Sequence, residues 1–436
     1  MRTVLAGTFV GRQAERLFGR GGAGWGIADQ AFSSLTNFAL GLAVVRGTDA
    51  AGFGAFSLGF AVYIIALNLS RAVATLPLTI RYSTASTPRW RDGAAAATGT
   101  ATAVGVGIGA ICVVIGVVVP YRPVADAFLG FGLMMPGLLL QDAWRFAFFA
   151  AGRGGAALAT DIVWAAALVP LFAVVQAGGL PVIGWATLAW GGAATVGALA
   201  GILLARLRPT PGRAAGWWRE HRDIAPRFVG EVLVSTVAGQ LTTYAIGLVG
   251  GLATLGVLRA GEFLLGPFNV LFQGVHNVAV PQGARIYARQ ASDLVGFCRL
   301  LAIGFAAAAM AWGIAVFLLP DFVGEAIIGP IWTEARGVLP ALTVALACLG
   351  LQSGPAIGLR VLAAARRSLR IGTATAIIVL AGMVVGAGAA GATGAAWGKA
   401  ITMAAGAAGY LWEFRGGFRD RARTDATPAA SRPSLS

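Results

Sequence analysis

Residues 53–78 read FGAFSLGFAVYIIALNLSRAVATLPL, an apolar run that contains one charged residue, Arg71. A helix needs about 20 predominantly apolar residues to cross the hydrocarbon core of a bilayer. This run is long enough, and it predicts a transmembrane helix. Runs of the same kind recur along most of the chain, which indicates a polytopic, all-α membrane protein.

The composition agrees with that class. Of the 436 residues, 57% are hydrophobic and only 12% are charged, whereas soluble domains carry about 25% charged residues. Too little polar surface remains to cover a water-facing globule, so lipid must cover part of it. The net charge of +15 is spread in short clusters between apolar runs, without a basic helix or a nucleic-acid-binding motif. We therefore expect no nucleic-acid partner.

A window of about 20 residues divides the chain into about twelve transmembrane helices. The predicted spans are Trp25–Val45, Phe53–Leu78, Thr98–Val119, Phe128–Ala150, Ala156–Ala177, Val182–Ala205, Phe228–Gly250, Leu255–Val280, Leu294–Leu319, Val338–Leu362, Ile371–Ala390 and Ala392–Phe414. The last two spans are separated by a tight turn at Gly391-Ala-Thr-Gly394.

The basic residues predict the orientation of these spans. Of the 33 Lys and Arg residues, 26 fall in the two terminal segments and the loops on one side of the membrane. The loops of the opposite side hold only Arg46, Arg122, Arg259 and Arg336. Because cytoplasmic loops carry the excess of Lys and Arg, we expect both termini in the cytoplasm and the protein in the inner (cytoplasmic) membrane.

The longest interior connection, residues 206–227, is basic and divides the spans six and six. Pro77 and Arg81 at one predicted span exit recur at the same spacing as Pro281 and Arg285, which favours a parallel repeat. The predicted organisation is a cytoplasmic arm (1–24), an N-lobe (25–205), a cytoplasmic linker (206–227), a C-lobe (228–414) and a basic, disordered cytoplasmic tail (415–436). The pair Trp217-Trp218 predicts a short amphipathic stretch at the membrane interface within the linker.

Charged residues inside spans are costly in lipid and usually face a cavity or a partner. We interpret Arg71, Arg145, Arg259 and Lys399 as candidates for the wall of a substrate cavity, with Asp142 and Glu262 as candidates for ion pairing or proton coupling. Asp142 and Arg145 share a helix face, as do Arg259 and Glu262. The set is net positive, which suits an anionic substrate such as a lipid diphosphate.

Other polar residues allow two interpretations. Asp29, Asp161, Glu231 and Arg46 lie near predicted span ends, where they could fix helix register or reach the interface, or else face the cavity. Asp29, Asp161 and Glu231 are further candidates for ion pairing or coupling, and Asp29 and Glu231 are candidates for proton coupling in particular. His276 could relay protons or be a satisfied polar residue near the interface. The three cysteines lie in separate apolar runs, so we expect no metal site; no cofactor motif or catalytic set indicates an enzyme.

Three segments resemble a known family. The first is Asp29-Gln-Ala-Phe-Ser-Ser-Leu-Thr-Asn37, followed by Val45-Arg46 and Gly52-Phe-Gly-Ala-Phe56. The others are Ile328-Gly-Pro-Ile-Trp332 and Gly391-Ala-Thr-Gly394. Together they resemble the polysaccharide flippase branch of the multidrug/oligosaccharidyl-lipid/polysaccharide (MOP) exporter superfamily. By this resemblance, Asn37 and Arg46 correspond to motif positions of the branch.

The resemblance implies two six-helix lobes in a V around a central cavity, and alternating access. It also implies a lipid-linked oligosaccharide or polysaccharide precursor as substrate, with membrane lipid and the glycan synthesis machinery of the cell envelope as partners. A multidrug exporter of the same superfamily is the first alternative, although such a protein should favour an acidic, aromatic cavity. A major-facilitator transporter is the second, but the loop after the second span lacks the usual glycine-rich basic motif.

Overall fold

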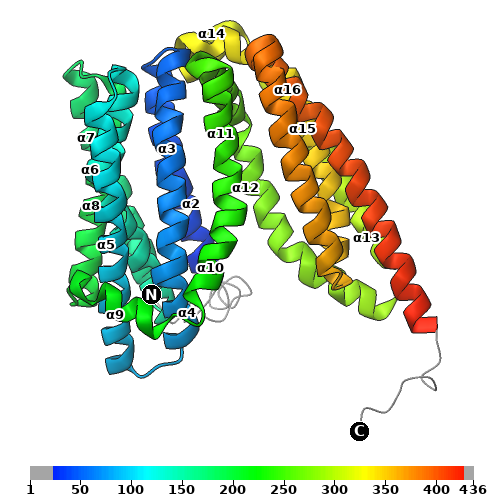
Figure 1. Cartoon of the computed structure of the whole chain (residues 1–436), viewed down its shortest axis with the longest axis horizontal. Coiled ribbons are helices and arrows are strands. Elements are labelled where there is room, and N and C mark those ends of the chain that lie inside the picture. Colours follow the sequence, from blue (N-terminus) through cyan, green and yellow to red (C-terminus); the bar gives the residue numbers. More distant parts are fainter. Residues whose placement is uncertain (1–22, 427–436) are drawn as a thin grey trace, which may run out of the picture. The chain divides into compact units, whose positions relative to one another are not determined.

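The computed structural model describes residues 23–426, without the side chains at 23, 27, 235, 269–271, 273–278 and 421–426. Contacts divide the chain into two compact units, of which unit 1 ends at Tyr244 and unit 2 begins at Ala245 (Figure 1). The described part is almost entirely helical and contains no strand. The division falls inside a helix, later in the chain than the predicted linker.

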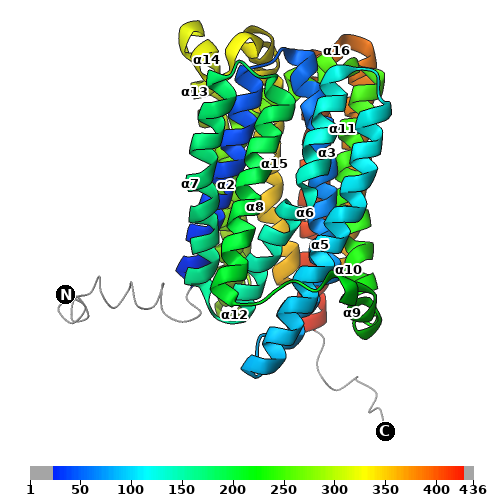
Figure 2. The ribbon, with the colours of Figure 1, turned by 90° about the vertical axis from the view of Figure 1, so that its left-hand side faces the viewer.

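Unit 1 contains most of the helices. Its elements are α2 (Ala23–Arg46), α3 (Ala50–Ser70), the π-helix η1 (Arg71–Thr75), α4 (Leu76–Tyr82), α5 (Thr87–Val118), α6 (Arg122–Ala150), α7 (Gly154–Ala177), α8 (Val182–Ala205), the 3₁₀-helix η2 (Pro211–Arg213), α9 (Ala214–Glu220), α10 (Ala225–Val232), the π-helix η3 (Leu233–Val237) and the greater part of α11 (Ala238–Val249). In Figure 2, α2, α7 and α8 lie side by side, and each contacts the other two.

Unit 2 is formed by fewer, longer helices. They are α12 (Gly251–Arg289), α13 (Asp293–Phe317), α14 (Asp321–Ile328), the 3₁₀-helix η4 (Gly329–Ile331), α15 (Trp332–Val361) and α16 (Ala365–Ala426). The central helix is α15, which packs against α12, α13 and α16.

Eight helical segments of the described chain are long and apolar enough to span a membrane, and the chain is a multi-pass membrane protein. Each predicted span coincides with helix, and one of them, Val182–Ala205, matches α8 at both ends. The total of twelve stays a prediction. Pro77 and Pro281, which we placed at span exits, lie inside helical runs that continue to Tyr82 and Arg289.

The predicted turn between the last two spans is confirmed. α16 is broken at Ala390 and Gly391, where Gly391 has φ 58° and ψ −139°. The two halves then pack backbone to backbone, because a Cβ atom on Gly386 would lie 2.1 Å from the carbonyl oxygen of Gly394. Small residues at such positions let helices approach closely without a hydrophobic driving force.

The core of unit 1 is aromatic. Trp144, Trp190, Phe131 and Phe148 are all fully buried, and the ring of Tyr63 contacts both Phe131 and Trp190. Around this core, α5 approaches α6 closely at two glycines, since a Cβ atom on Gly105 or Gly109 would collide with the α6 backbone. The close packing brings the polar side chains of neighbouring helices within reach of one another.

The predicted linker is folded against unit 1. Arg213 pairs with Asp92 on α5, and the backbone N–H of Thr210 donates to the carbonyl oxygen of Ala95. Trp217 corrects our interpretation, because its side chain is buried in a core cluster with Tyr82 and Trp144 while Trp218 is exposed. Only one face of α9 is therefore free to meet the interface.

The predicted disordered tail is helical as far as Ala426, because α16 continues through it. Ion pairs hold this end in place. Glu413 pairs with Arg367 and Arg370, and Arg367 also pairs with Asp420 at 2.5 Å. Phe414 and Phe418 pack into the same region. Charge alone predicted disorder here, and these contacts explain why residues 415–420 are helical instead.

The turn at Gly391 gives a stability prediction. Gly391→Ala should lower the free energy of unfolding by about 1–3 kcal/mol, since its backbone conformation is one that only glycine adopts without strain. Thermal unfolding of the purified protein in detergent measures the change. The control is Gly304→Ala within α13, where a Cβ atom has open space; equal destabilisation by both substitutions would contradict the prediction.

Candidate functional site

Arg71 stands at the first position of the π-helix η1. Its carbonyl oxygen accepts a hydrogen bond from the N–H of Leu76, five residues later. The carbonyl oxygen of Val73, inside the π segment, accepts a hydrogen bond of 3.0 Å from the indole N–H of Trp217 on α9. Single π turns within helices frequently mark functional sites. The hydrophobic pattern of the sequence did not predict the π-helix at Arg71–Thr75.

The Arg71 side chain forms a bidentate ion pair with Asp142 on α6. Its Nε donates to Oδ2 at 2.9 Å and a terminal nitrogen donates to Oδ1 at 2.7 Å. The guanidinium also lies 5.2 Å from the ring centroid of Phe146. A planar fork that meets both carboxylate oxygens is the strongest form of such a pair.

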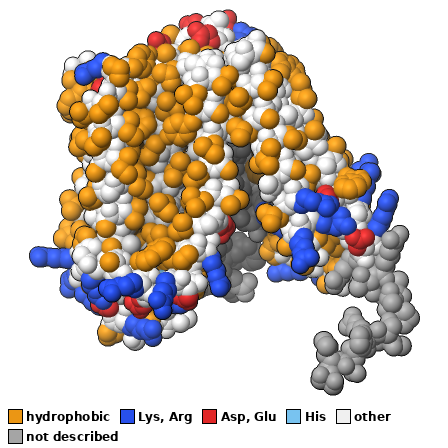
Figure 3. Space-filling view, in the orientation of Figure 1, with side chains coloured by type: hydrophobic (Ala, Val, Ile, Leu, Met, Phe, Trp, Pro, Cys, Tyr) orange, Lys and Arg blue, Asp and Glu red, His pale blue; other side chains and the backbone are white. Residues whose placement is uncertain are grey.

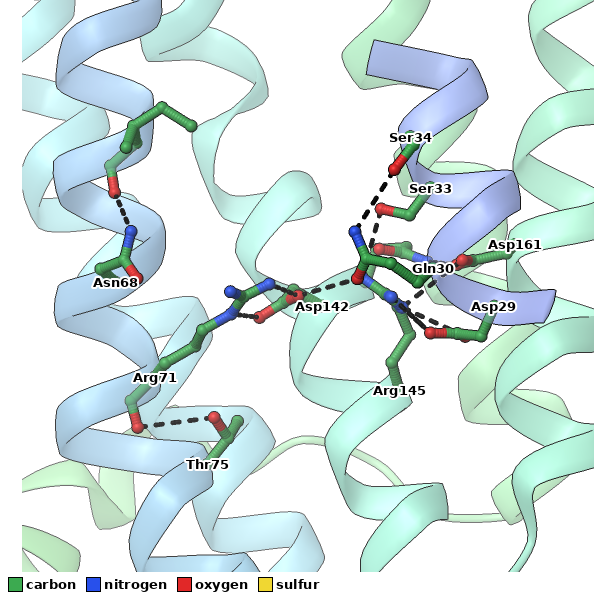
Figure 4. Close-up of polar contacts among 12 residues, drawn as sticks. Asp29, Gln30, Ser33, Ser34, Asn68, Arg71, Thr75, Asp142, Arg145 and Asp161 are labelled. Atoms are coloured by element: carbon green, nitrogen blue, oxygen red, sulfur yellow. Dashed lines mark hydrogen bonds and ion pairs between the residues drawn. The ribbon is translucent and has the colours of Figure 1, made fainter. Parts of the chain in front are cut away.

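The guanidinium of Arg145, which follows Asp142 by one turn of α6, contacts three carboxylates (Figure 4). It binds Asp29 of α2 through Nε at 3.1 Å and through a terminal nitrogen. It also reaches Asp142 at 3.3 Å and the Oδ2 atom of Asp161 on α7 at 3.4 Å. Asp142 lies between the two arginines, so the residues form one connected set, which we call the unit 1 network: Asp29, Arg71, Asp142, Arg145 and Asp161.

The unit 1 network is buried except at Arg71. The side chains of Asp29, Asp142, Arg145 and Asp161 are each at most 8% exposed, while the side chain of Arg71 is 30% exposed. Three carboxylates face two guanidiniums, so the formal charge of the network is −1 when every member is ionised. One added proton would make it neutral. Asp29 and Asp161 are thus partners of Arg145, rather than charges that reach toward the interface.

Unit 2 contains a second intramembrane set, which we call the unit 2 triad: Arg259 and Glu262 on α12 and Lys399 on α16. Arg259 donates to Glu262 Oε2 at 2.8 Å and Lys399 donates to Oε1 at 2.5 Å. All three side chains are between 25% and 35% exposed. The formal charge of the triad is +1.

Asn37, Arg46, Glu231 and His276 were also predicted from the sequence. The Oδ1 atom of Asn37 on α2 is buried and accepts no hydrogen bond from any described residue. Arg46 is exposed and lines a pocket of about 410 Å³ with Gln176 and Val182 at the opposite end of α2 from Asp29. Glu231 is exposed on α10. The side chain of His276 lies outside the described residues.

Sequence reasoning missed two contributors to the unit 1 network. Gln141 donates to Asp161 Oδ1 at 2.5 Å, and Ser33 lies 3.4 Å from a terminal nitrogen of Arg145. Gln141 and Asp142, followed by Arg145, form a polar run in an otherwise apolar helix, and this run could have indicated Gln141. Within the described residues, no group of three or more His, Cys, Asp or Glu side chains is placed to hold a metal ion.

Comparison of the sequence with protein-family models gives no match, and comparison with curated proteins gives none either. Solved structures do match. A multidrug resistance MATE family transporter of the MOP superfamily, in its inward-facing conformation, superposes with a TM-score of 0.63 at 16% identity, covering 90% of this chain and 96% of that one. The fold is that of the MOP transporters.

Two further structures agree with the MOP fold. The lipid II flippase MurJ in an inward closed conformation matches with a TM-score of 0.61 at 12% identity, covering 93% of each chain. A variant of the Vibrio cholerae MATE transporter VcmN matches with a TM-score of 0.53 at 15% identity, covering 94% of this chain and 98% of that one. The neighbours with the MOP fold are transporters and flippases of two different substrate classes.

The burial of Arg145 gives a second stability prediction. Arg145→Gln should lower the free energy of unfolding by about 3–5 kcal/mol, because it leaves buried carboxylates without their counter-charge. Unfolding in detergent, followed by circular dichroism, measures this.

The matched control for this substitution is Arg213→Gln. It breaks an ion pair whose two side chains are 51% and 64% exposed, and exposed pairs contribute about 0–1 kcal/mol. A loss in Arg145→Gln no larger than in this control would show that the unit 1 network does not hold the helices together.

Proposed function

We propose that this protein is a membrane transporter that moves a lipid-linked anionic glycan precursor, an oligosaccharide or polysaccharide precursor on a lipid diphosphate, across the cytoplasmic membrane by alternating access. The observation that carries the proposal is the unit 2 triad. Two cationic side chains share one carboxylate, and all three groups remain partly exposed. The MOP fold, shared with a lipid II flippase among other transporters, supports the same class of function.

The triad suits an anion because it brings two cationic side chains together around one carboxylate. A charged group inside a span is costly, and chains keep such groups where a pathway or a partner uses them. A diphosphate that approached Arg259 and Lys399 would accept charge-assisted hydrogen bonds from both side chains. Glu262, held by both cations, would fix their positions between transport events.

The unit 1 network has the opposite balance and fits energy coupling. Because it has one more carboxylate than guanidinium groups, it can bind one proton and become neutral, with no net positive charge left in the membrane. Asp161 is the natural position for that proton, since its Oδ2 atom has Arg145 at 3.4 Å but accepts no hydrogen bond. We therefore assign proton coupling to this network and anion binding to the triad. The chain would work beside the glycan synthesis machinery of the cell envelope.

Export of organic cations is the second candidate function. The network's formal charge of −1 favours it, as does the aromatic ring of Phe146 beside Arg71, because cations bind carboxylates and aromatic faces. MATE family multidrug transporters share the fold. The two candidates differ in which charged set meets the substrate, and substitutions can separate them.

The test is a leaflet-translocation assay in proteoliposomes with a lipid-diphosphate-linked sugar. Lys399→Gln and Arg259→Gln should each reduce the translocation rate about tenfold or more, since a hydrogen bond between charged groups contributes about 1.5–3 kcal/mol. The control is Arg336→Gln. Arg336 has the same side-chain exposure as Arg259, 35%, and it likewise forms an ion pair with a carboxylate, that of Asp321.

Three outcomes decide between the candidates. Translocation that falls in the triad variants and persists in the control supports the flippase. Equal loss in the control variant contradicts the assignment of anion binding to the triad. No movement of the lipid-linked sugar, together with proton-driven uptake of an organic cation that Asp161→Asn abolishes, would replace the flippase with the cation exporter.

A further inference from the structure

A groove at one end of unit 2 has the composition of a lipid site. It encloses about 400 Å³ between α13 and α16, with Leu351 and Pro355 of α15 as its floor. α15 packs against both neighbouring helices, so the groove is bounded on three sides. A volume of about 300–1,000 Å³ is typical of pockets that hold small organic ligands.

Three arginines surround one end of this groove. Arg299 comes from α13, and Arg415 and Arg419 come from α16. The last two are one turn apart and share a helix face. All three are exposed, and no described carboxylate forms a salt bridge with any of them. Glu413 and Asp420, close to them along α16, pair with Arg367 and Arg370 instead.

The rest of the lining is apolar. Ile303 on α13 lies one turn beyond Arg299, and Leu411 on α16 lies one turn before Arg415. Because the two helices run in opposite senses, both apolar residues lie deeper in the predicted membrane than the arginines. Figure 3 shows Lys and Arg side chains gathered at this end of unit 2 and largely uncharged surface beyond them. The basic residues belong to the side predicted as cytoplasmic.

From this arrangement we infer that the groove between α13 and α16 binds an anionic phospholipid of the cytoplasmic leaflet, with its phosphate on Arg299, Arg415 and Arg419 and an acyl chain against Ile303, Leu411 and Phe414. Basic pockets between transmembrane helices on the cytoplasmic side hold acidic head groups. The apolar depth of the groove requires a chain as well as a head group, which a free phosphate does not supply. The site is independent of the transported substrate.

Lipid binding can be measured by native mass spectrometry of the full chain, released from micelles that contain phosphatidylglycerol and phosphatidylcholine with the same acyl chains. The wild type should retain phosphatidylglycerol in preference to phosphatidylcholine. In the triple variant Arg299→Gln/Arg415→Gln/Arg419→Gln, the ratio of retained phosphatidylglycerol to retained phosphatidylcholine should fall at least about tenfold. Each basic residue near an anionic surface contributes about 1 kcal/mol to binding.

The matched control removes the same charge from the same unit. Arg285, Arg289 and Arg366 are also exposed, also lie on the predicted cytoplasmic side, and do not line the groove. Their triple exchange to Gln should leave the preference unchanged. Equal loss in both triple variants would overturn the proposal, because it would show attraction by net charge alone.

A second variant tests the apolar half. Ile303 is 51% exposed, so Ile303→Trp can fill the groove without disturbing the core and should reduce retention of both lipids while all three arginines remain. Unchanged retention in this variant would overturn the assignment of the acyl chain. Displacement of the lipid by glycerol phosphate at equal concentration would show a site for soluble phosphate, and absence of any preference in the wild type would remove the site altogether.

Discussion

The contact of Arg145 with three carboxylates is the constraint on which unit 1 depends. One guanidinium joins α2, α6 and α7, and Asp142 extends the connection to Arg71 at the start of η1. In an apolar surrounding these charged groups are not hydrated, so each remains ionised only because a group of opposite charge lies beside it. The glycine-mediated approach of α5 to α6 and the aromatic core around Trp144 and Trp190 hold the helix backbones at the spacing that these contacts require.

The charge balance differs between the two units, and this difference separates the roles that we propose for them. The unit 1 network is buried and carries one carboxylate in excess, whereas the unit 2 triad is partly exposed and carries one cation in excess. A buried set with a negative balance is suited to exchange of a proton. A more accessible set with a positive balance is suited to recognition of an anion. The similarity of the fold to both MATE transporters and a lipid II flippase is compatible with either substrate class, so the side chains, and not the fold, have to distinguish them.

Much of the fold was predictable because membrane spans are defined by length and hydrophobicity, both of which a single sequence displays. The ends of α8 and the turn at Gly391 were obtained in this way. The membership of the unit 1 network was harder to predict. Asp29 and Asp161 lie near the ends of their helices, and only the packing of α2 and α7 beside α6 reveals that both reach Arg145. Burial of Trp217 likewise depends on where the linker folds, which composition does not specify, and the π-helices have no signature in hydropathy.

The π segment at Arg71 also affects how this protein should be aligned with others. A π turn closes its hydrogen bond over five residues, where an α turn uses four, so η1 accommodates one more residue along nearly the same length of helix axis. A helical wheel drawn for a regular α-helix through residues 50–82 would consequently assign the residues after Thr75 to the wrong face. A related chain that lacks one residue here could follow the same path as an unbroken α-helix. A single-residue gap at this point of an alignment would therefore mark a conserved geometry rather than a loss of structure.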